Sequence, residues 1–133
     1  SLWMAPSNQR AKREHAMSKT VKDLKIKTKS LHRIMKDMEY TEKEIVSQQN
    51  RIQSVKDNPE KDEHDVKKQE EVLAEYLGAR VDEFERLKDF TGKLKEFMDG
   101  AEHELVELKE SEEVMAAQKA LADATAVIAA KES

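Results

Sequence analysis

The chain is poor in the residues that make turns, bridges and aromatic clusters. Its 133 residues contain no cysteine, three glycines, two prolines and 5% aromatic side chains. No disulfide can form, so packing alone must hold the fold. So few turn-forming residues exclude an all-β architecture. Apolar runs are short as well: the longest pure one is Ala126–Ala130, far below the ~20 residues of a membrane span. The start of the chain also lacks the apolar core of a signal peptide. We therefore expect no membrane partner and a cytoplasmic location.

The abundant residues favour long helices and disfavour catalysis. Charged residues make up 39% of the chain and hydrophobic ones 38%, a balance typical of coiled coils. The resulting thin core offers no deep apolar cleft for a small substrate. The sequence has no glycine-rich phosphate loop, and adjacent carboxylates such as Glu112 and Glu113 point in different directions on a helix. The four histidines are far apart in sequence: His15, His32, His64 and His103. We therefore expect no enzyme activity, no cofactor and no metal site.

A seven-residue repeat predicts the first long helix, over residues 20–56. Its inner line is Leu24, Leu31, Met38, Ile45 and Ile52. Spacings of three and four residues place these apolar side chains on one helical face. A second line, four residues further on each time, consists of Thr28, Met35, Glu42 and Gln49. We expect the two polar members, Glu42 and Gln49, to leave this seam imperfect.

Two breaks divide the rest of the chain. The first is DNPEKDEH, residues 57–64, in which Pro59 cannot continue a helix. A second helix, 60–98, follows; we place its start between residues 59 and 65 and interpret Gly78 and Gly92 as bends or close helix contacts. The Asp99-Gly100 pair is the second break, with Gly100 as the residue after the helix end. A third helix, 101–130, then has the following inner face: Leu105, Leu108, Val114, Met115, Ala117, Leu121, Ala124 and Ile128.

The fold class expected from these elements is all-α. Short connections make successive helices antiparallel, so residues 20–131 are predicted to form an up-down-up three-helix bundle with coiled-coil-like packing. Residues 1–19 are a basic tail, either flexible or a helical extension that begins near Ser7. Because the first residue is not Met, we expect Ser1–Trp3 to be added residues and Met4 a native start.

Charge is distributed unevenly. Residues 1–56 carry a net charge of +7, residues 57–98 one of −5 and residues 99–133 one of −6. One interpretation is a basic helix that packs beside two acidic ones; the other is a basic surface for an acidic partner. The chain as a whole is acidic and has few aromatic side chains for stacking on bases, so we expect no nucleic-acid partner.

Three sequence strings resemble the tubulin-binding cofactor A family. They are Leu24–Thr28 (LKIKT), the run from His32-Arg33-Ile34 to Glu42-Lys43-Glu44, and DVKKQEEVL from Asp65 to Leu73. Their order and spacing, with a charged loop before KKQEEVL, match the family from about Val21 to the end of the third helix. The chain departs from the family in three places. Val81 stands near a usual proline, residues 101–112 are about one turn longer, and residues 1–19 are extra.

The resemblance implies a small chaperone of the tubulin-folding pathway. Members of the family are three-helix bundles that capture β-tubulin released by the cytosolic chaperonin, hold it without nucleotide, and pass it to other tubulin-folding cofactors. It also implies a cytoplasmic, microtubule-associated location. The alternative is a generic three-helix adaptor or scaffold with a non-tubulin partner. Monomer and homodimer both remain open.

The resemblance suggests a partner-binding surface made of helix faces. Its candidates are the outward residues of the matching strings: Lys25, Lys27, Lys29, Glu39, Tyr40, Lys67, Lys68, Glu70 and Glu71. The plainer interpretation of the same residues is that several only cap the second helix or form ion pairs across helices. We expect binding through them to be largely electrostatic.

Overall fold

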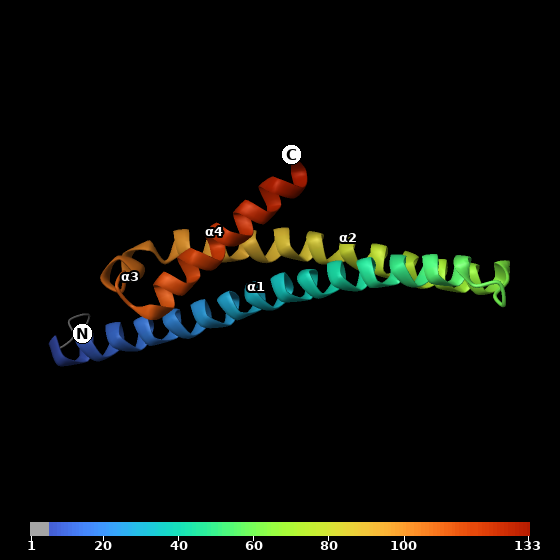
Figure 1. Ribbon diagram of the computed structural model, residues 1–133. Helices are drawn as coiled ribbons and strands as arrows, with labels where there is room; N and C mark the ends of the chain where they lie inside the picture. The colour runs from blue at the N-terminus through green and yellow to red at the C-terminus, as the bar shows by residue number, and fades with distance from the viewer. Residues whose placement is uncertain (1–5) are drawn as a thin grey trace. The chain divides into compact units, whose positions relative to one another are not determined.

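The computed structural model describes residues 6–133, and all regular structure there is helical. Four helices follow one another: α1 (Pro6–Asp57), α2 (Glu63–Gly100), α3 (Glu102–Glu107) and α4 (Glu112–Glu132) (Figure 1). The all-α prediction is therefore confirmed. Residues 1–5 of the expected tail lie outside the described part, and α1 begins directly after them. The chain divides into two units, one of residues 6–32 with 89–133 and one of residues 33–88.

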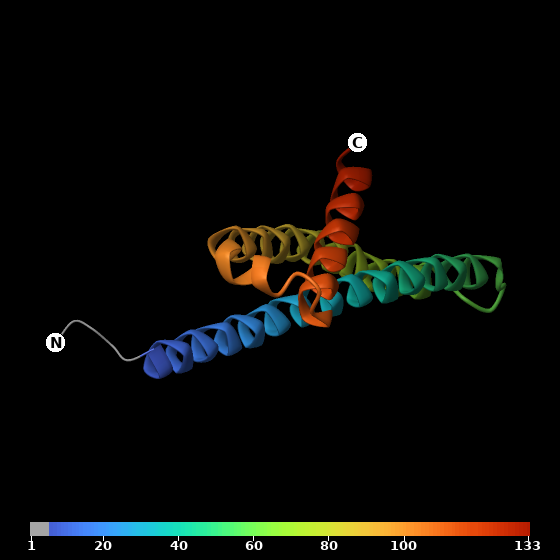
Figure 2. The same cartoon turned by 90° about the vertical axis from the view of Figure 1, so that its left-hand side faces the viewer.

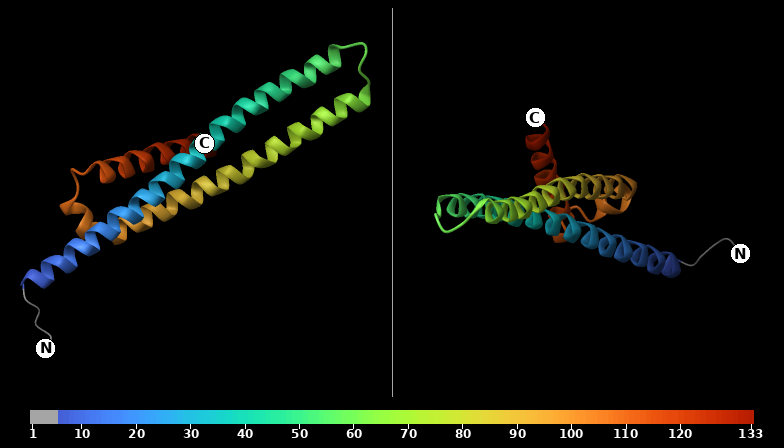
Figure 3. Two further views of the ribbon diagram at one scale, coloured as in Figure 1. Left: turned by 90° about the horizontal axis from the view of Figure 1, so that it is seen from below. Right: turned by 90° about the vertical axis from the view of Figure 1, so that its right-hand side faces the viewer.

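The unit of residues 33–88 is a helical hairpin. Within it α1 and α2 run antiparallel and are joined at residues 58–62 (Figure 3). The buried residues of α1 alternate at spacings of four and three, as in a coiled-coil seam: Ile34, Met38, Thr41, Ile45, Gln48 and Ile52. The inner line of apolar residues is buried as predicted, but the polar residue predicted beside it, Gln49, is not. Gln48 is fully buried and Gln49 is exposed, because the seam returns after three residues from Ile45 rather than four.

Side chains in the connection end one helix and start the next. The Asn58 side chain accepts a hydrogen bond from the Glu60 amide at 2.9 Å, which forms a tight turn after α1. Asp62 and Asp65 then form a reciprocal pair, each carboxylate accepting the other residue's backbone N–H at 3.1 Å. This is a capping box, which satisfies two amides that lack helical partners. It explains why α2 begins at Glu63, within the predicted window.

The other unit is packed with apolar side chains. Leu24 and Leu31 of α1 and Leu94 of α2 are completely buried, and α3 adds Leu105. Figure 2 shows α3 as a short turn of helix between the end of α2 and the start of α4. The contribution of α4 is one valine and three alanines: Val114, Ala117, Ala120 and Ala124. Small side chains at these spacings let the helix backbone come close to its neighbours.

The predicted third helix is not continuous. Residues 108–111 separate α3 from α4, although they contain neither glycine nor proline. The Leu108 amide donates to the Leu105 carbonyl, which tightens the last turn of α3. Ser111 then caps α4 by accepting the Val114 amide at 3.3 Å. This break falls within residues 101–112, the segment that the sequence comparison above predicts to be about one turn longer than in the family.

Two smaller expectations are wrong and one is narrowed. Gly100 is the last residue of α2 and has no positive φ, so it does not act as a left-handed stop. A Cβ at Gly78 or Gly92 would meet nothing within 4 Å, so neither glycine marks a close helix contact, and the alternative, a bend, stays a prediction. Met115, expected on the inner face, is 50% exposed, since the buried positions of α4 advance from Val114 to Ala117 and Ala120.

Candidate partner-binding surface

Tyr40 is the main exposed aromatic side chain of the hairpin. It lies on α1 with 63% of its surface exposed, and the neighbouring Glu39 is exposed as well. One turn further along, Glu44 accepts a hydrogen bond from the Tyr76 hydroxyl of α2 at 3.2 Å. Partial burial, reinforced by this carboxylate, raises the pKa of Tyr76. The Tyr76 hydroxyl is therefore bonded across the seam, whereas the Tyr40 side chain is exposed to solvent, where a partner can contact it.

Polar pairs hold the two helices in register behind this surface. Arg80 contacts Glu42 through two parallel bonds, Nε to Oε1 at 2.8 Å and Nη2 to Oε2 at 3.0 Å. Thr41 donates to a Glu83 carboxylate oxygen at 2.9 Å, and the other oxygen of Glu83 is buried without a partner. A fork-shaped pair is geometrically selective. The seam thus fixes which faces of α1 and α2 point outward.

A groove near the turn contains two of the predicted residues. Lys67 and Glu70 line it together with the apolar side chains of Val55 and Val66 and the stem of Lys56, around a volume of about 850 Å³. Glu70 lies 4.0 Å from the Lys56 ammonium, and both side chains are about half exposed. A pair this exposed contributes little to stability. Its charges can therefore be redirected to a partner at small cost.

The remaining two candidates of α2 lie beside the groove. Lys68 and Glu71 are exposed and, three residues apart, share one helical face. Lys67 and Glu71 are four apart and share the adjoining one. The KKQEEVL string therefore presents four charged side chains outward from one turn and a half of α2. Between them Gln69 points inward, where it meets Gln48.

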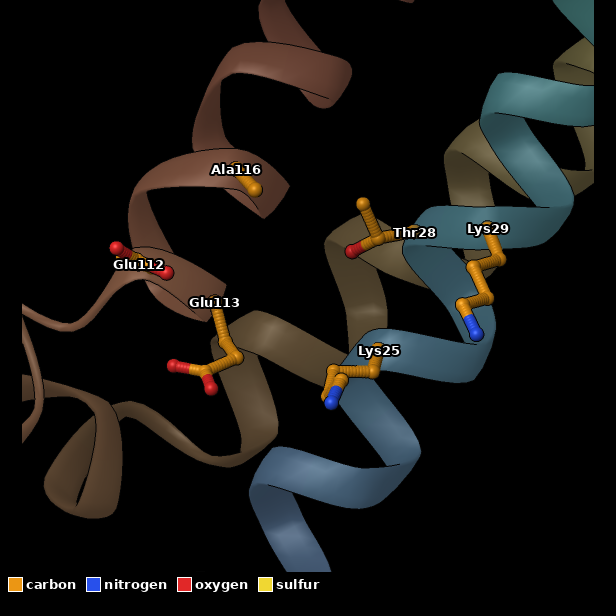
Figure 4. A pocket seen from close by; sticks show the side chains of 6 residues that line it. All are labelled: Lys25, Thr28, Lys29, Glu112, Glu113 and Ala116. Atoms are coloured by element: carbon orange, nitrogen blue, oxygen red, sulfur yellow. The ribbon is translucent and has the colours of Figure 1, made fainter.

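In the other unit, two of the three predicted lysines lie together and one does not. Lys25 and Lys29 line a pocket of about 270 Å³, across from Glu112 and Glu113 of α4 (Figure 4). Lys27 lies on a different face of α1, with its ammonium 4.6 Å from the centre of the Phe97 ring. A cation over an aromatic face is attracted to the ring electrons. Lys27 is thus used within the unit, and Lys25 and Lys29 remain surface candidates.

Two features of the surface were not found from the sequence. Gln48 is buried and fully bonded: its amide donates to the backbone and side-chain oxygens of Gln69 at 2.8 and 2.9 Å, and it accepts from Arg51 at 2.6 Å. The signal that indicates Gln48 is the strict alternation of spacings from Ile34. Ile26 is 59% exposed, because it lies off the seam between two buried positions, and the high charge around it hides this in the sequence.

The part of the chain that the structure describes has neither a metal-binding group nor a membrane-spanning helix. From Pro6 to Ser133 no three His, Asp or Glu side chains are grouped so that they could hold a metal ion. None of the helices described combines the length and apolar character needed to cross a membrane. What the geometry offers is charged, exposed helix faces over a fixed seam, which suits the binding of another macromolecule.

Comparison with known proteins identifies the family. The model of the family "Tubulin binding cofactor A" matches residues 19–121. The chain belongs to this family. It is 36% identical over 104 residues to tubulin-folding cofactor A of Arabidopsis thaliana, covering 78% of this chain and 89% of that protein. It is also 36% identical to tubulin-specific chaperone A of Schizosaccharomyces pombe over 66% of this chain and 73% of that one.

A solved structure agrees with the family assignment. The crystal structure of tubulin folding cofactor A from Arabidopsis thaliana superposes with a TM-score of 0.66 and 32% identity, covering 81% of this chain and 97% of that one. The matched family region includes all nine predicted surface residues. Residues 8–18 of α1, which are also helical here, precede it.

Proposed function

We propose that this protein is a tubulin-folding chaperone that captures quasi-native β-tubulin. The observation that carries the proposal is the family match over residues 19–121, together with relatives named tubulin-folding cofactor A and tubulin-specific chaperone A. In this function the protein receives β-tubulin after its release from the cytosolic chaperonin and hands it to further tubulin-folding cofactors. It works in the cytoplasm, close to the microtubule cytoskeleton, without nucleotide and without a covalent step.

The exposed helix faces of the hairpin support binding without a pocket. Tyr40 supplies an aromatic anchor, a residue type enriched among the residues that carry binding energy. The charged string Lys67–Glu71 supplies orientation, since complementary charges mainly steer and register a complex. Lys25 and Lys29 form a separate charged patch in the other unit. Each patch is a contact surface in its own right.

The proposal includes the assembly of the helices. The three long helices, α1, α2 and α4, form an antiparallel up-down-up bundle. Paramagnetic labels on α4 that broaden the signals of α1 near Leu24 and of α2 near Leu94, which belong to the same unit as α4, would support this arrangement. The absence of any broadening there would contradict it.

The direct test is complex formation with β-tubulin. Purified protein is mixed with β-tubulin, and separately with α-tubulin, and each mixture is resolved by native gel and by size exclusion with light scattering. We expect a stable complex with β-tubulin alone, and its mass also decides whether the free chaperone is a monomer or a homodimer. Binding to neither tubulin, or equally to both, would reject the proposal.

Variants then test the surface. Tyr40→Ala and the charge reversal Lys67→Glu/Lys68→Glu are each expected to weaken the β-tubulin complex at least tenfold. The matched control is Lys109→Glu/Lys131→Glu, which changes net charge equally at two exposed lysines elsewhere. Affinity should also fall as salt rises, because exposed charges are screened. If the control loses as much affinity as the reversal at Lys67 and Lys68, the surface assignment is wrong.

A further inference from the structure

One exposed face of α1 carries a run of basic side chains that the family match does not explain. Its members are three or four residues apart and all are exposed, forming what we call the basic stripe: Lys12, His15, Lys19, Lys22, Ile26 and Lys29. At 3.6 residues per turn these six positions fall within an arc of about 100°. The stripe begins before residue 19, where the family match starts.

Few acidic side chains of its own unit face the stripe. Glu112 and Glu113 lie across the pocket from its last member, Lys29. Among residues 8–32 the only acidic side chains are Glu14 and Asp23; the helical period puts Glu14 well outside the arc and Asp23 just beyond its edge. No ion pair within the described unit involves a lysine of the stripe. Three lysines of α2 and α4 in this unit, by contrast, pair with aspartates four residues away: Lys93, Lys95 and Lys119. The lysines of the stripe therefore present positive charge to solvent from one face of α1.

The middle of the stripe also offers an apolar contact. Ile26 is 59% exposed between Lys22 and Lys29. An apolar side chain of a partner that covers Ile26 would remove apolar surface from water and so favour binding. At the end near Lys29, Glu112 and Glu113 lie across the pocket (Figure 4) and so limit how far an anionic partner can extend.

We propose that the basic stripe is a docking site for an acidic, extended peptide segment of another protein. From Lys12 to Lys29 the stripe is about 26 Å long at 1.5 Å per residue, which an extended chain of about eight residues spans. Carboxylates on one edge of that segment meet the lysines, and one apolar side chain covers Ile26. This goes beyond the proposed function, because it concerns a face partly outside the family region and does not require the partner to be tubulin.

A peptide is a better match than a nucleic acid. Single-stranded nucleic acids are bound by basic grooves with aromatic side chains on which bases stack, and the stripe has an aliphatic residue instead and no aromatic one. The chain as a whole carries a net charge of −4, which opposes non-specific binding to a polyanion as large as a nucleic acid. A short acidic segment meets only the local field of the stripe.

The test uses the full chain and a fluorescent nine-residue probe of eight glutamates around a central leucine, followed by fluorescence anisotropy. We expect binding at 50 mM salt that weakens at 300 mM salt. Lys19→Glu/Lys22→Glu should lower affinity at least tenfold, and Lys109→Glu/Lys131→Glu less than twofold. Ile26→Ser should weaken binding of this probe but not of an all-glutamate probe. Circular dichroism checks that each variant is helical, and Lys19→Gln/Lys22→Gln replaces the reversal if it unfolds.

Four outcomes would overturn the proposal. The first is no binding of either probe, and the second is an equal loss of affinity in Lys19→Glu/Lys22→Glu and Lys109→Glu/Lys131→Glu. The third is tighter binding of a nine-nucleotide RNA than of the peptide. The fourth is self-association of the chain that is lost in Lys19→Glu/Lys22→Glu. The last would assign the stripe to a second copy of the chain. Its failure is separable from that of the proposed function, because the β-tubulin assay uses a different probe and different variants.

Discussion

The unit of residues 6–32 and 89–133 buries leucine, valine and alanine together with three threonines, whereas the hairpin of residues 33–88 buries isoleucine and methionine of α1 together with Thr41 and the glutamine Gln48. In the first unit Leu24, Leu31 and Leu94 are all fully buried. In the hairpin the described buried apolar side chains of α2 reduce to Leu87, and hydrogen bonds such as Gln48 to Gln69 cross the seam. One pair of helices is thus held by two kinds of contact.

The difference separates stability from register. Apolar burial is strong and non-directional, so it can hold helices together without specifying which residues face each other. Buried polar pairs contribute less, but a shifted register leaves them unsatisfied. In the hairpin this keeps Tyr40 and the charged side chains of Lys67, Lys68, Glu70 and Glu71 on the outside, as the proposed binding surface requires.

The largest effect is expected from truncation in the apolar unit. Leu94→Ala removes a fully buried side chain and should lower the free energy of unfolding by about 2–5 kcal/mol. Urea unfolding followed by circular dichroism measures the loss, and amide exchange shows whether residues 89–133 open first. Ile26→Ala, at an exposed position of the same unit, is the control and should stay within about 0.5 kcal/mol. Equal losses would deny that this unit has an apolar core.

A smaller loss is expected from the polar seam. Gln48→Ala leaves the side-chain oxygen of Gln69 without its donor and Arg51 without its acceptor. The free energy of unfolding should fall by about 1–3 kcal/mol. The neighbouring Gln49→Ala removes an exposed amide and serves as the control. Amide exchange in the hairpin should rise for the first variant and not for the second. A cost at position 49 as large as at 48 would contradict the assigned seam.

Replacing both glutamines tests whether the seam serves register rather than stability. Gln48→Leu/Gln69→Leu removes both side chains of the pair. Arg51 loses its acceptor, but it is exposed and can bond to water, so stability should rise or change by less than about 1 kcal/mol. Cysteine pairs placed at matched and at shifted positions report register through disulfide formation. We expect the double variant to form shifted disulfides that the wild type does not. Unchanged register would show that the glutamines do not specify it.

The exposed ion pair between Arg80 and Glu42 should contribute less to the free energy of unfolding than Gln48 does. Arg80 and Glu42 are 43% and 45% exposed, so water competes for their charges. A double-mutant cycle with Glu42→Ala and Arg80→Ala should give a coupling of roughly 0.2–1 kcal/mol that shrinks at high salt. A coupling that survives 1 M salt would mean that the pair is more enclosed than its exposure indicates.

The sequence predicts the inner line of α1 well. Leu24, Leu31 and Ile45 are buried as the seven-residue repeat requires. It fails where the physics leaves two choices. Spacings of three and four residues both fit a helix, so the repeat predicts Gln49 at the buried position that Gln48 occupies. The break at residues 108–111 contains neither glycine nor proline. The Ser111 cap of α4 competes there with a continuous helix. Packing decides between these two conformations, and the local sequence does not show the outcome.

The surface was predictable only in outline. All of the charged candidates in Lys67–Glu71 are exposed, since charge itself keeps side chains in water. The sequence gives no sign that Lys27 lies over the Phe97 ring, because that ring is seventy residues away in the sequence. Periodicity gives the face of a helix but not the identity of its neighbours.

The smallest effect concerns the turn of the hairpin and its dependence on pH. The backbone amide of Asp65 donates to the Asp62 carboxylate and lowers the pKa of Asp62 below 3.8. Because the folded pKa is lower than the unfolded one, the stabilisation is complete above about pH 3.8 and is lost as pH falls through the folded value. Carbon-detected NMR titration should therefore give Asp62 a pKa below 3.8, and amide exchange in the first turn of α2 should accelerate in acid beyond its intrinsic change. Asp62→Asn keeps a capping side chain without the titration, so its first turn should show no such acid step. An acid step of equal size in that variant would trace the effect to another carboxylate and leave the hairpin's turn independent of Asp62.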